Sequence, residues 1–108
     1  MAGLSDHDGR NAHVAGNGIE KPILVTEKKP DYTVDAMRAK LEGSVELEVV
    51  VLVDGTVGDV RVTKSLDQVH GLDDKAIEAA KQCRFRPGTN DGVPVPVRMA
   101  ILMVFALH

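Results

Sequence analysis

The stretch V-P-V-P-V-R-M-A-I-L-M-V-F-A-L, residues 93–107, decides the fold of this 108-residue chain. All of its odd-numbered positions are apolar, whereas its even-numbered positions include Pro94, Pro96 and Arg98. Alternation with a period of two over this length predicts a β-strand that has one face in a hydrophobic core. The odd-numbered side chains from Val93 to Leu107 are therefore expected to point inward.

The two prolines place this strand at the edge of its sheet. Proline lacks a backbone N–H, and Pro94 and Pro96 have the same parity, so one lateral side of the strand loses two donors. Beyond them the same side keeps ordinary donors and acceptors. Such an edge either pairs with a partner strand or is covered by a helix, a loop or a second copy of the chain. The residues predicted to bind a partner are Val97, Arg98, Met99, Ala100, Ile101, Leu102, Met103, Val104 and Phe105.

Two more strands are predicted upstream of this edge. Residues 44–53 alternate, and their inward positions are Val45, Leu47, Val49, Val51 and Val53. Asp54-Gly55 predicts a tight hairpin turn, and a returning strand is expected at 57–64. Glu46 and Glu48 are expected to face Arg61 across this hairpin.

Two helices are also predicted. Thr33 is a suitable N-cap for a helix over 34–42, and Gly43 is expected to end that helix in a left-handed conformation. Its apolar stripe is Val34, Met37 and Leu41. A second helix is expected over 72–82 with Asp73 as its N-cap, and its stripe is Leu72, Ala76, Ile77, Ala79, Ala80 and Cys83.

The order of these elements predicts the topology. If the helix at 72–82 makes a right-handed crossover, it places the last strand beside 44–53. The expected fold class is α+β, a three-stranded antiparallel sheet in the order 57–64, 44–53, 93–107 with two helices packed on one face. Residues 1–20, which are rich in Gly, Asn and Asp, are expected to form a flexible lead-in or linker, and 21–108 the folded domain. Within that domain, residues 23–25 form a short extended piece.

Composition excludes several classes of protein. The chain has 44% hydrophobic and 27% charged residues, typical of a globular domain, and its net charge of −3 argues against a nucleic-acid partner. The single cysteine excludes an internal disulfide. No apolar run approaches the length of a membrane helix, and residues 1–20 lack the apolar core of a signal peptide.

The residues that carry chemistry also have structural interpretations. Cys83 lies on the apolar stripe of a helix, where a free cysteine is usually a core residue. His70 has no partnered cysteine or acid at ligand spacing, and Asp6, His7, Asp8 and His13 fit no closed metal site. We therefore predict that the protein is not an enzyme and has no catalytic residue, metal ligand or cofactor.

The aromatic and basic residues also have structural interpretations. Phe85 and Tyr32 are interpreted as core residues. Arg84, Arg86 and Arg98 are interpreted as a solvated basic rim near the end of the second helix, where they complement its dipole. The alternative is that the three arginines guide an acidic peptide.

Four runs together resemble a known family. They are K-P-D-Y-T-V-D-A-M, E-G-S-V-E-L-E-V-V-V-L-V-D-G-T-V-G-D-V-R-V-T-K-S, G-L-D-D-K-A-I-E-A-A and R-F-R-P-G-T-N-D-G-V-P-V-P-V. From about residue 21 to 107 the chain resembles the TonB C-terminal domain family. Two departures stand out. Cys83 occupies a position where the family usually has an aromatic residue, commonly Trp, and neither a membrane helix nor a long Pro-rich linker is present.

The resemblance implies a function. It implies the periplasmic module of a TonB-type energy transducer, which binds a segment of an outer-membrane TonB-dependent receptor by β-strand addition and transmits force for active uptake. Inner-membrane motor proteins would act through an N-terminal region absent from this chain, which would also anchor the protein to the inner membrane. The alternative is an envelope adaptor or dimerisation module that uses the same edge, for example in a homodimer, without energy transduction.

Overall fold

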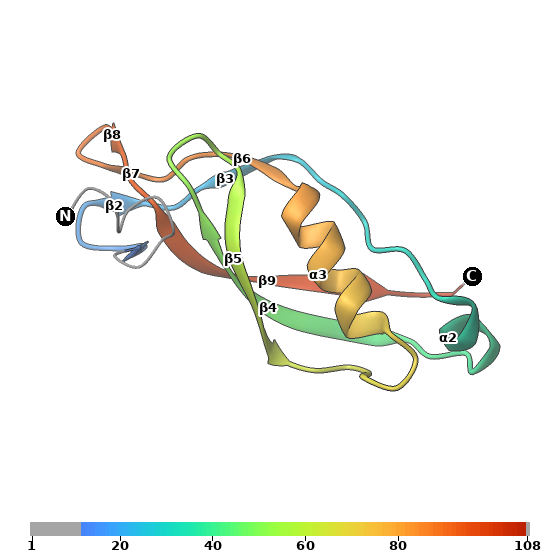
Figure 1. Cartoon of the computed structure of the whole chain (residues 1–108). Coiled ribbons are helices and arrows are strands. Elements are labelled where there is room, and N and C mark those ends of the chain that lie inside the picture. The colour runs from blue at the N-terminus through green and yellow to red at the C-terminus, as the bar shows by residue number, and fades with distance from the viewer. Residues whose placement is uncertain (1–11, 108) are drawn as a thin grey trace.

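The computed structural model describes residues 12–107 and shows an elongated α+β fold of 48 × 27 × 20 Å (Figure 1). Its elements in chain order are β1 (His13–Val14), β2 (Ile19–Glu20), β3 (Ile23–Thr26), α2 (Val34–Arg38), β4 (Gly43–Val51), β5 (Val57–Lys64), α3 (Leu72–Gln82), β6 (Arg84–Arg86), β7 (Thr89–Asn90), β8 (Val93–Pro94) and β9 (Val97–Phe105). Neither helix in this described range is long and apolar enough to cross a membrane.

The main sheet has the order β1-β9-β4-β5. This confirms the predicted order of the three long strands, and both β9 and β5 are antiparallel to β4. The prediction of a three-stranded sheet is wrong in two respects. The short strand β1 pairs in parallel with the start of β9, and two further small sheets, β2-β7-β8 and β3-β6, lie outside the main one.

Part of the expected lead-in is therefore paired. Residues 1–11 lie outside the described residues, but β1 and β2 fall within 12–20, where no regular structure was expected. The division of the chain at residue 20 stays a prediction.

The predicted single strand over 93–107 is in fact two strands. Asp91 and Gly92 both have positive φ, 51° and 83°, which is the geometry of a two-residue hairpin turn. This turn folds β8 back onto β7, so that Pro94 pairs with Thr89 in a different sheet. The strand resumes as β9 only after Pro96, which has no N–H to offer to a ladder.

The core lies between the main sheet and α3, which crosses one face of it (Figure 1). The inward residues of β4 are fully buried as predicted. Val53 was also expected to point inward, but it is exposed, because β4 ends at Val51. The small side chains Ala76, Ala79 and Ala80 let α3 pack closely against the sheet, as its predicted stripe indicated.

The first helix differs from the prediction. Thr33 caps α2, since its Oγ accepts the N–H of Ala36 at 3.1 Å, but the helix ends at Arg38 rather than 42. Its buried residue is Ala36, whereas Val34 and Met37 are exposed. The predicted stripe is wrong because α2 is only five residues long and lies at the end of the sheet (Figure 1) rather than across its face.

Gly43 is also not the cap of this helix. It is the first residue of β4, with φ of +147°, and Lys40 takes the left-handed conformation at φ 55°. The chain after α2 is held by Tyr32 instead. The Tyr32 hydroxyl donates to the carbonyl of Leu41 at 2.7 Å, and its ring packs edge-on against Phe105.

Asp73 does not cap α3 as predicted, because Gly71 occupies the N-cap position and has no side chain to accept the bond. The Asp73 carboxylate is buried and turns back to the preceding loop. It accepts hydrogen bonds from the backbone N–H groups of Leu66 and Asp67 and from the Ser65 hydroxyl. This carboxylate therefore fixes the path of the β5–α3 connection.

We expect Asp73→Ala to destabilise the fold by about 2–3 kcal/mol, because it leaves these loop donors without an acceptor. The matched control is Asp74→Ala, one residue on and exposed, which loses only its interaction with the helix dipole, below about 1 kcal/mol. Urea unfolding of both variants measures the difference, and equal midpoints would contradict the role given to Asp73.

Gly55 joins the β4–β5 hairpin to β6. It has φ of +86°, and the Phe85 N–H donates to its carbonyl at 2.9 Å. A Cβ at this position would lie 2.0 Å from the carbonyl oxygen of Phe85. The hairpin tip therefore approaches β6 as closely as only glycine allows.

Gly55→Ala is expected to destabilise the protein by at least about 2 kcal/mol more than Gly92→Ala. Gly92 has nearly the same φ, but a Cβ there meets nothing within 4 Å, so that variant carries only the backbone strain. Thermal unfolding compares the two variants directly. If both variants lose the same stability, the close approach of the Phe85 carbonyl does not contribute to the cost of Gly55→Ala.

Candidate strand-binding site

One edge of β9 is free along most of its length. The carbonyl of Pro96 accepts the N–H of His13 at 2.8 Å, so the backbone groups at even-numbered positions point away from β4. The register places odd-numbered residues such as Ile101 opposite inward residues of β4 such as Leu47. Among the described residues, no strand pairs with β9 on its outer side beyond Arg98. The free positions are Ala100, Leu102 and Val104.

The structure sorts the predicted partner-binding residues into three groups. Val97, Met103 and Phe105 are buried in the core, and Met99 and Ile101 are half-buried. Ala100, Leu102 and Val104 are exposed, the last two at 61% and 62%. Arg98 is half-buried and is already paired with β1. The binding role of all nine residues stays a prediction.

The free edge opens into a groove, whose far wall is the segment 21–32. A cavity of about 440 Å³ lies between β9 and β3, and a second of about 350 Å³ continues along β9 toward Ala106. Glu27, Leu102 and Met103 line both cavities, so the two form one groove along the strand. The remaining wall residues from the N-terminal segment are Lys21, Pro22, Ile23, Leu24, Lys29, Pro30 and Tyr32.

The floor of the groove is apolar. Cys83 and Phe85 line the larger cavity together with Met99 and Ile101. The prediction that Cys83 and Phe85 are core residues is confirmed, since both are buried. The Cys83 thiol is 3.5 Å from the carbonyl of Ala79, one turn back in α3. An apolar side chain entering the groove would therefore meet other apolar side chains.

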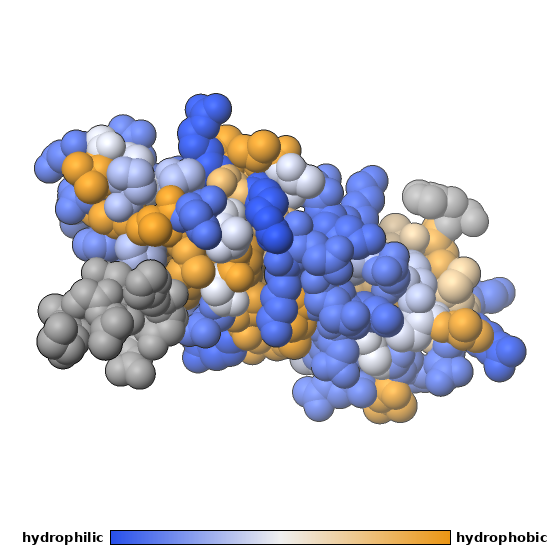
Figure 2. All heavy atoms as spheres, turned by 45° about the horizontal axis from the view of Figure 1, so that its top comes forward, coloured by the Kyte–Doolittle hydropathy of each residue, from blue (hydrophilic) through white to orange (hydrophobic). Residues whose placement is uncertain are grey.

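The wall formed by β3 could not be assigned from the sequence. All four residues of β3 are exposed, although three of them are Ile23, Leu24 and Val25. In Figure 2, exposed hydrophobic residues gather on the half of the molecule that carries the small sheets, whereas the other half is mostly hydrophilic. The apolar run between two prolines was the available signal, but nothing in it indicates which strand it faces.

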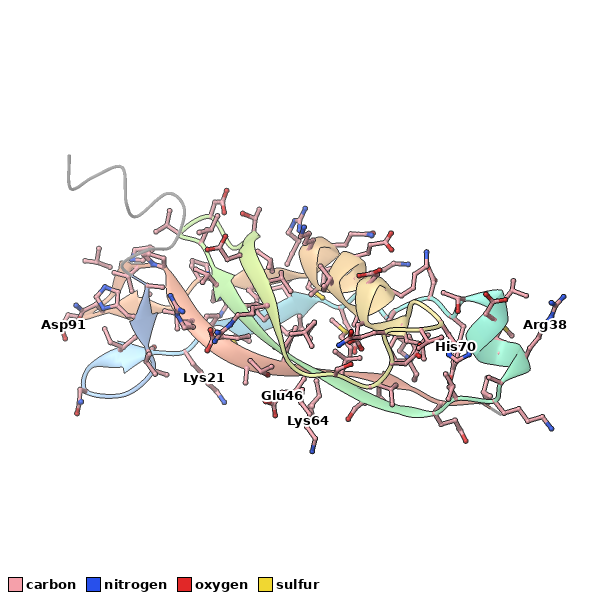
Figure 3. All side chains as sticks on the ribbon, turned by 60° about the horizontal axis from the view of Figure 1, so that its bottom comes forward. Lys21, Arg38, Glu46, Lys64, His70 and Asp91 are labelled. Atoms are coloured by element: carbon pink, nitrogen blue, oxygen red, sulfur yellow. The ribbon has the colours of Figure 1, made fainter. Side chains whose placement is uncertain are left out.

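The charged face of the sheet lies opposite α3. The Glu48 carboxylate accepts from Arg61 at 2.9 Å and from Arg98 at 3.3 Å, which confirms the predicted cross-strand pair for Glu48 but not for Glu46. Glu46 and Lys64 are register partners, and both point away from α3 (Figure 3). Such exposed pairs contribute little stability.

The three arginines do not form a common guide for an acidic peptide. Arg84 donates to the carbonyls of Lys81 and Cys83, which complements the end of α3 as the rim interpretation predicted. Arg86 is exposed on β6, and Arg98 is held by Glu48 on the opposite face of the sheet.

The loop before α3 contains a histidine–carboxylate pair that the sequence analysis missed. His70 Nδ1 lies 2.9 Å from Asp67 Oδ1, three residues back. Burial alone would raise the pKa of Asp67, but hydrogen bonds from the His70 side chain and from the backbone of His70 and Leu72 lower it overall. The His70 carbonyl accepts the Thr33 hydroxyl at 2.6 Å, so the pair ties this loop to α2.

Within residues 12–107, no three His, Cys, Asp or Glu side chains gather as metal ligands. Asp6, His7 and Asp8 lie outside the described residues. His13 lies in β1, and its backbone pairs with β9.

Comparison with known proteins agrees with this architecture. The solution NMR structure of the Pseudomonas aeruginosa TonB CTD matches with a TM-score of 0.65 at 23% sequence identity, over 90% of this chain and 94% of that chain. At that identity the match supports the fold alone.

Sequence comparison identifies related proteins as well as the fold. Protein TonB of Vibrio cholerae serotype O1 is 34% identical over 91 residues, which are 83% of this chain and 37% of that protein. The chain therefore spans little more than a third of the length of this relative. A sequence model of the Gram-negative bacterial TonB protein C-terminal matches residues 28–107, which begin just after β3 and include all later elements. The chain belongs to the family of Gram-negative bacterial TonB protein C-terminal domains.

Proposed function

We propose that this domain is the periplasmic module of a TonB-type energy transducer and binds an extended segment of an outer-membrane receptor by β-strand addition. The observation that carries the proposal is the edge at Ala100, Leu102 and Val104, which within residues 12–107 is unpaired and opens into a groove. An incoming strand satisfies these backbone groups and extends the main sheet outward from β9.

Backbone pairing alone gives weak binding. Four to six backbone hydrogen bonds contribute about 0.5–1.5 kcal/mol each, whereas association costs about 4–15 kcal/mol. Side chains of the partner therefore have to contribute. Alternate side chains of an added strand point toward the same face as the odd-numbered residues of β9, which places them over Cys83 and Phe85. A partner with apolar residues at two such alternate positions fits the groove best.

Force transmission belongs to the same proposal. A pull delivered through the upstream region, from inner-membrane motor proteins, would reach the partner through β9. That strand is paired with β4 over its whole length, from Val97 to Phe105. A load along β9 is then shared by all of its hydrogen bonds to β4. The partner strand is held by only about four to six hydrogen bonds, so it separates from β9 before β9 separates from β4. We place the domain in the periplasm, anchored to the inner membrane through an upstream region.

A second function has one observation in its favour. Leu102 and Val104 are exposed next to the unpaired backbone edge of β9. The same edge of a second copy of the domain can therefore pair with it. An envelope adaptor or dimerisation module would use the edge in this way, without energy transduction. Sedimentation equilibrium distinguishes it, because a dimer lost on changing Leu102 favours this second function.

Leu102→Pro is expected to abolish receptor binding while leaving the fold intact, because the lost N–H faces the groove. Ile101→Pro removes an N–H that faces β4 and is expected to unfold the domain. Leu102→Ala is the matched control, since it loses the side chain but keeps the donor, and it should reduce binding only in part. Circular dichroism reports the fold, and calorimetric titration with peptides from the periplasmic segments of outer-membrane receptors of the same bacterium reports binding.

Two results would contradict this prediction. If Leu102→Pro unfolds the domain, the assignment of the free side of β9 is wrong. If it folds and binds receptor peptides as the unmodified protein does, strand addition at this edge is wrong.

A further inference from the structure

We propose that residues 13–15 act as an intramolecular competitor that occupies the upstream end of the β9 edge and regulates how much of it a partner can use. The inference rests on the proposed function, because it concerns the same edge. β1 pairs in parallel with β9, with His13 opposite Val97 and Val14 opposite Arg98. These are the first two positions of the surface predicted to bind the partner.

β1 satisfies the backbone groups that a partner would otherwise use. The His13 N–H donates to the Pro96 carbonyl at 2.8 Å, and the parallel register directs the His13 carbonyl at the N–H of Arg98. Downstream, at Ala100, Leu102 and Val104, the edge is free among the described residues. A partner strand that extends upstream of Ala100 therefore has to displace β1.

β1 is attached weakly enough to be displaced. It contains two residues, and Val14 is 68% exposed, so the pairing buries little apolar surface. Ala15 is exposed as well. The attachment therefore depends on backbone hydrogen bonds, each of which contributes little net free energy.

The segment after β1 keeps it close to the edge. Asn17 and Gly18 have φ of 51° and 88°, and Gly16 and Ile19 exchange two backbone hydrogen bonds of 3.0 Å around them. This is a preformed two-residue turn. Ile19 and Glu20 then pair with Asn90 and Thr89 in a separate small sheet. A displaced β1 thus stays tethered at high effective concentration and returns when the partner leaves.

The test uses the full chain and a pair of proline variants chosen by parity. His13→Pro removes the N–H that bonds Pro96, whereas Val14→Pro removes an N–H that points away from β9 and serves as the control. The probes are two peptides of alternating threonine and valine with a terminal lysine. The nine-residue peptide spans the whole of β9, and the five-residue peptide spans only Ala100 to Val104.

We expect His13→Pro to bind the nine-residue peptide about twofold to tenfold more tightly than the unmodified chain and the Val14→Pro variant. The five-residue peptide should bind all three proteins equally. Without any peptide, the backbone amide of Arg98 should exchange with solvent faster in His13→Pro than in the other two proteins, because β1 no longer covers it.

The outcomes separate this inference from the proposed function. If His13→Pro binds the long peptide no more tightly, while Leu102→Pro abolishes binding, the edge binds strands but β1 is not a competitor. If His13→Pro binds more weakly, β1 supports the partner instead, and the inference is overturned. If neither peptide binds any of the folded proteins, both the inference and strand addition at this edge are overturned.

Discussion

The antiparallel pairing of β4 with β9 is the constraint on which the rest of the structure depends. The two strands stay in register over nine pairs, from Gly43 with Phe105 to Val51 with Val97. Because side chains alternate, this register places all inward residues of both strands on one face, and a shift by one residue would expose them. The face on which α3 packs and the side of β9 that remains open to a partner both follow from it.

The other elements meet this pair through a few close contacts rather than a large core. The alanines of α3 let the helix approach β4, and Asp73 holds the loop that precedes it. The carbonyl of Phe85 lies against Gly55 at the tip of the hairpin, so β6 is held close to the tip of the β4–β5 hairpin. Among the segments that the structure describes, β3 pairs with β6 and not with β9, and this leaves the groove along the outer side of β9 beyond Arg98.

The candidate site thus combines segments that are far apart in the sequence. Its backbone donors and acceptors come from β9, its far wall from residues 21–32, and its floor from Cys83 and Phe85. Cys83 is a small side chain at the end of α3, and an apolar cavity of about 440 Å³ lies above it. Arg84 and Arg98 do not contribute free charges to this surface, since Arg98 is engaged by Glu48 and Arg84 by the end of α3.

The sequence alone determined the long elements and their order. Alternation over 44–53 and over most of 93–107, the Asp54-Gly55 turn and the alanine stripe of α3 are local patterns, and the structure contains each of them. The resemblance to the TonB C-terminal domain family could also be found from these runs. The Asn17-Gly18 turn was a readable signal as well, but it lies in a stretch whose composition suggests flexibility.

Only the tertiary structure decided how the short pieces are paired. Two-residue strands such as β1 and β8 have no period, and α2 is too short for its stripe to show which residue is buried. The carboxylate of Asp73 bonds the loop and not the helix end, because the path of that loop brings the backbone N–H groups of Leu66 and Asp67 within its reach. The groove was likewise invisible in the sequence, because it lies between two segments whose separation depends on which strand β3 pairs with. Local patterns specify elements, but long-range packing selects among partners that the same patterns allow.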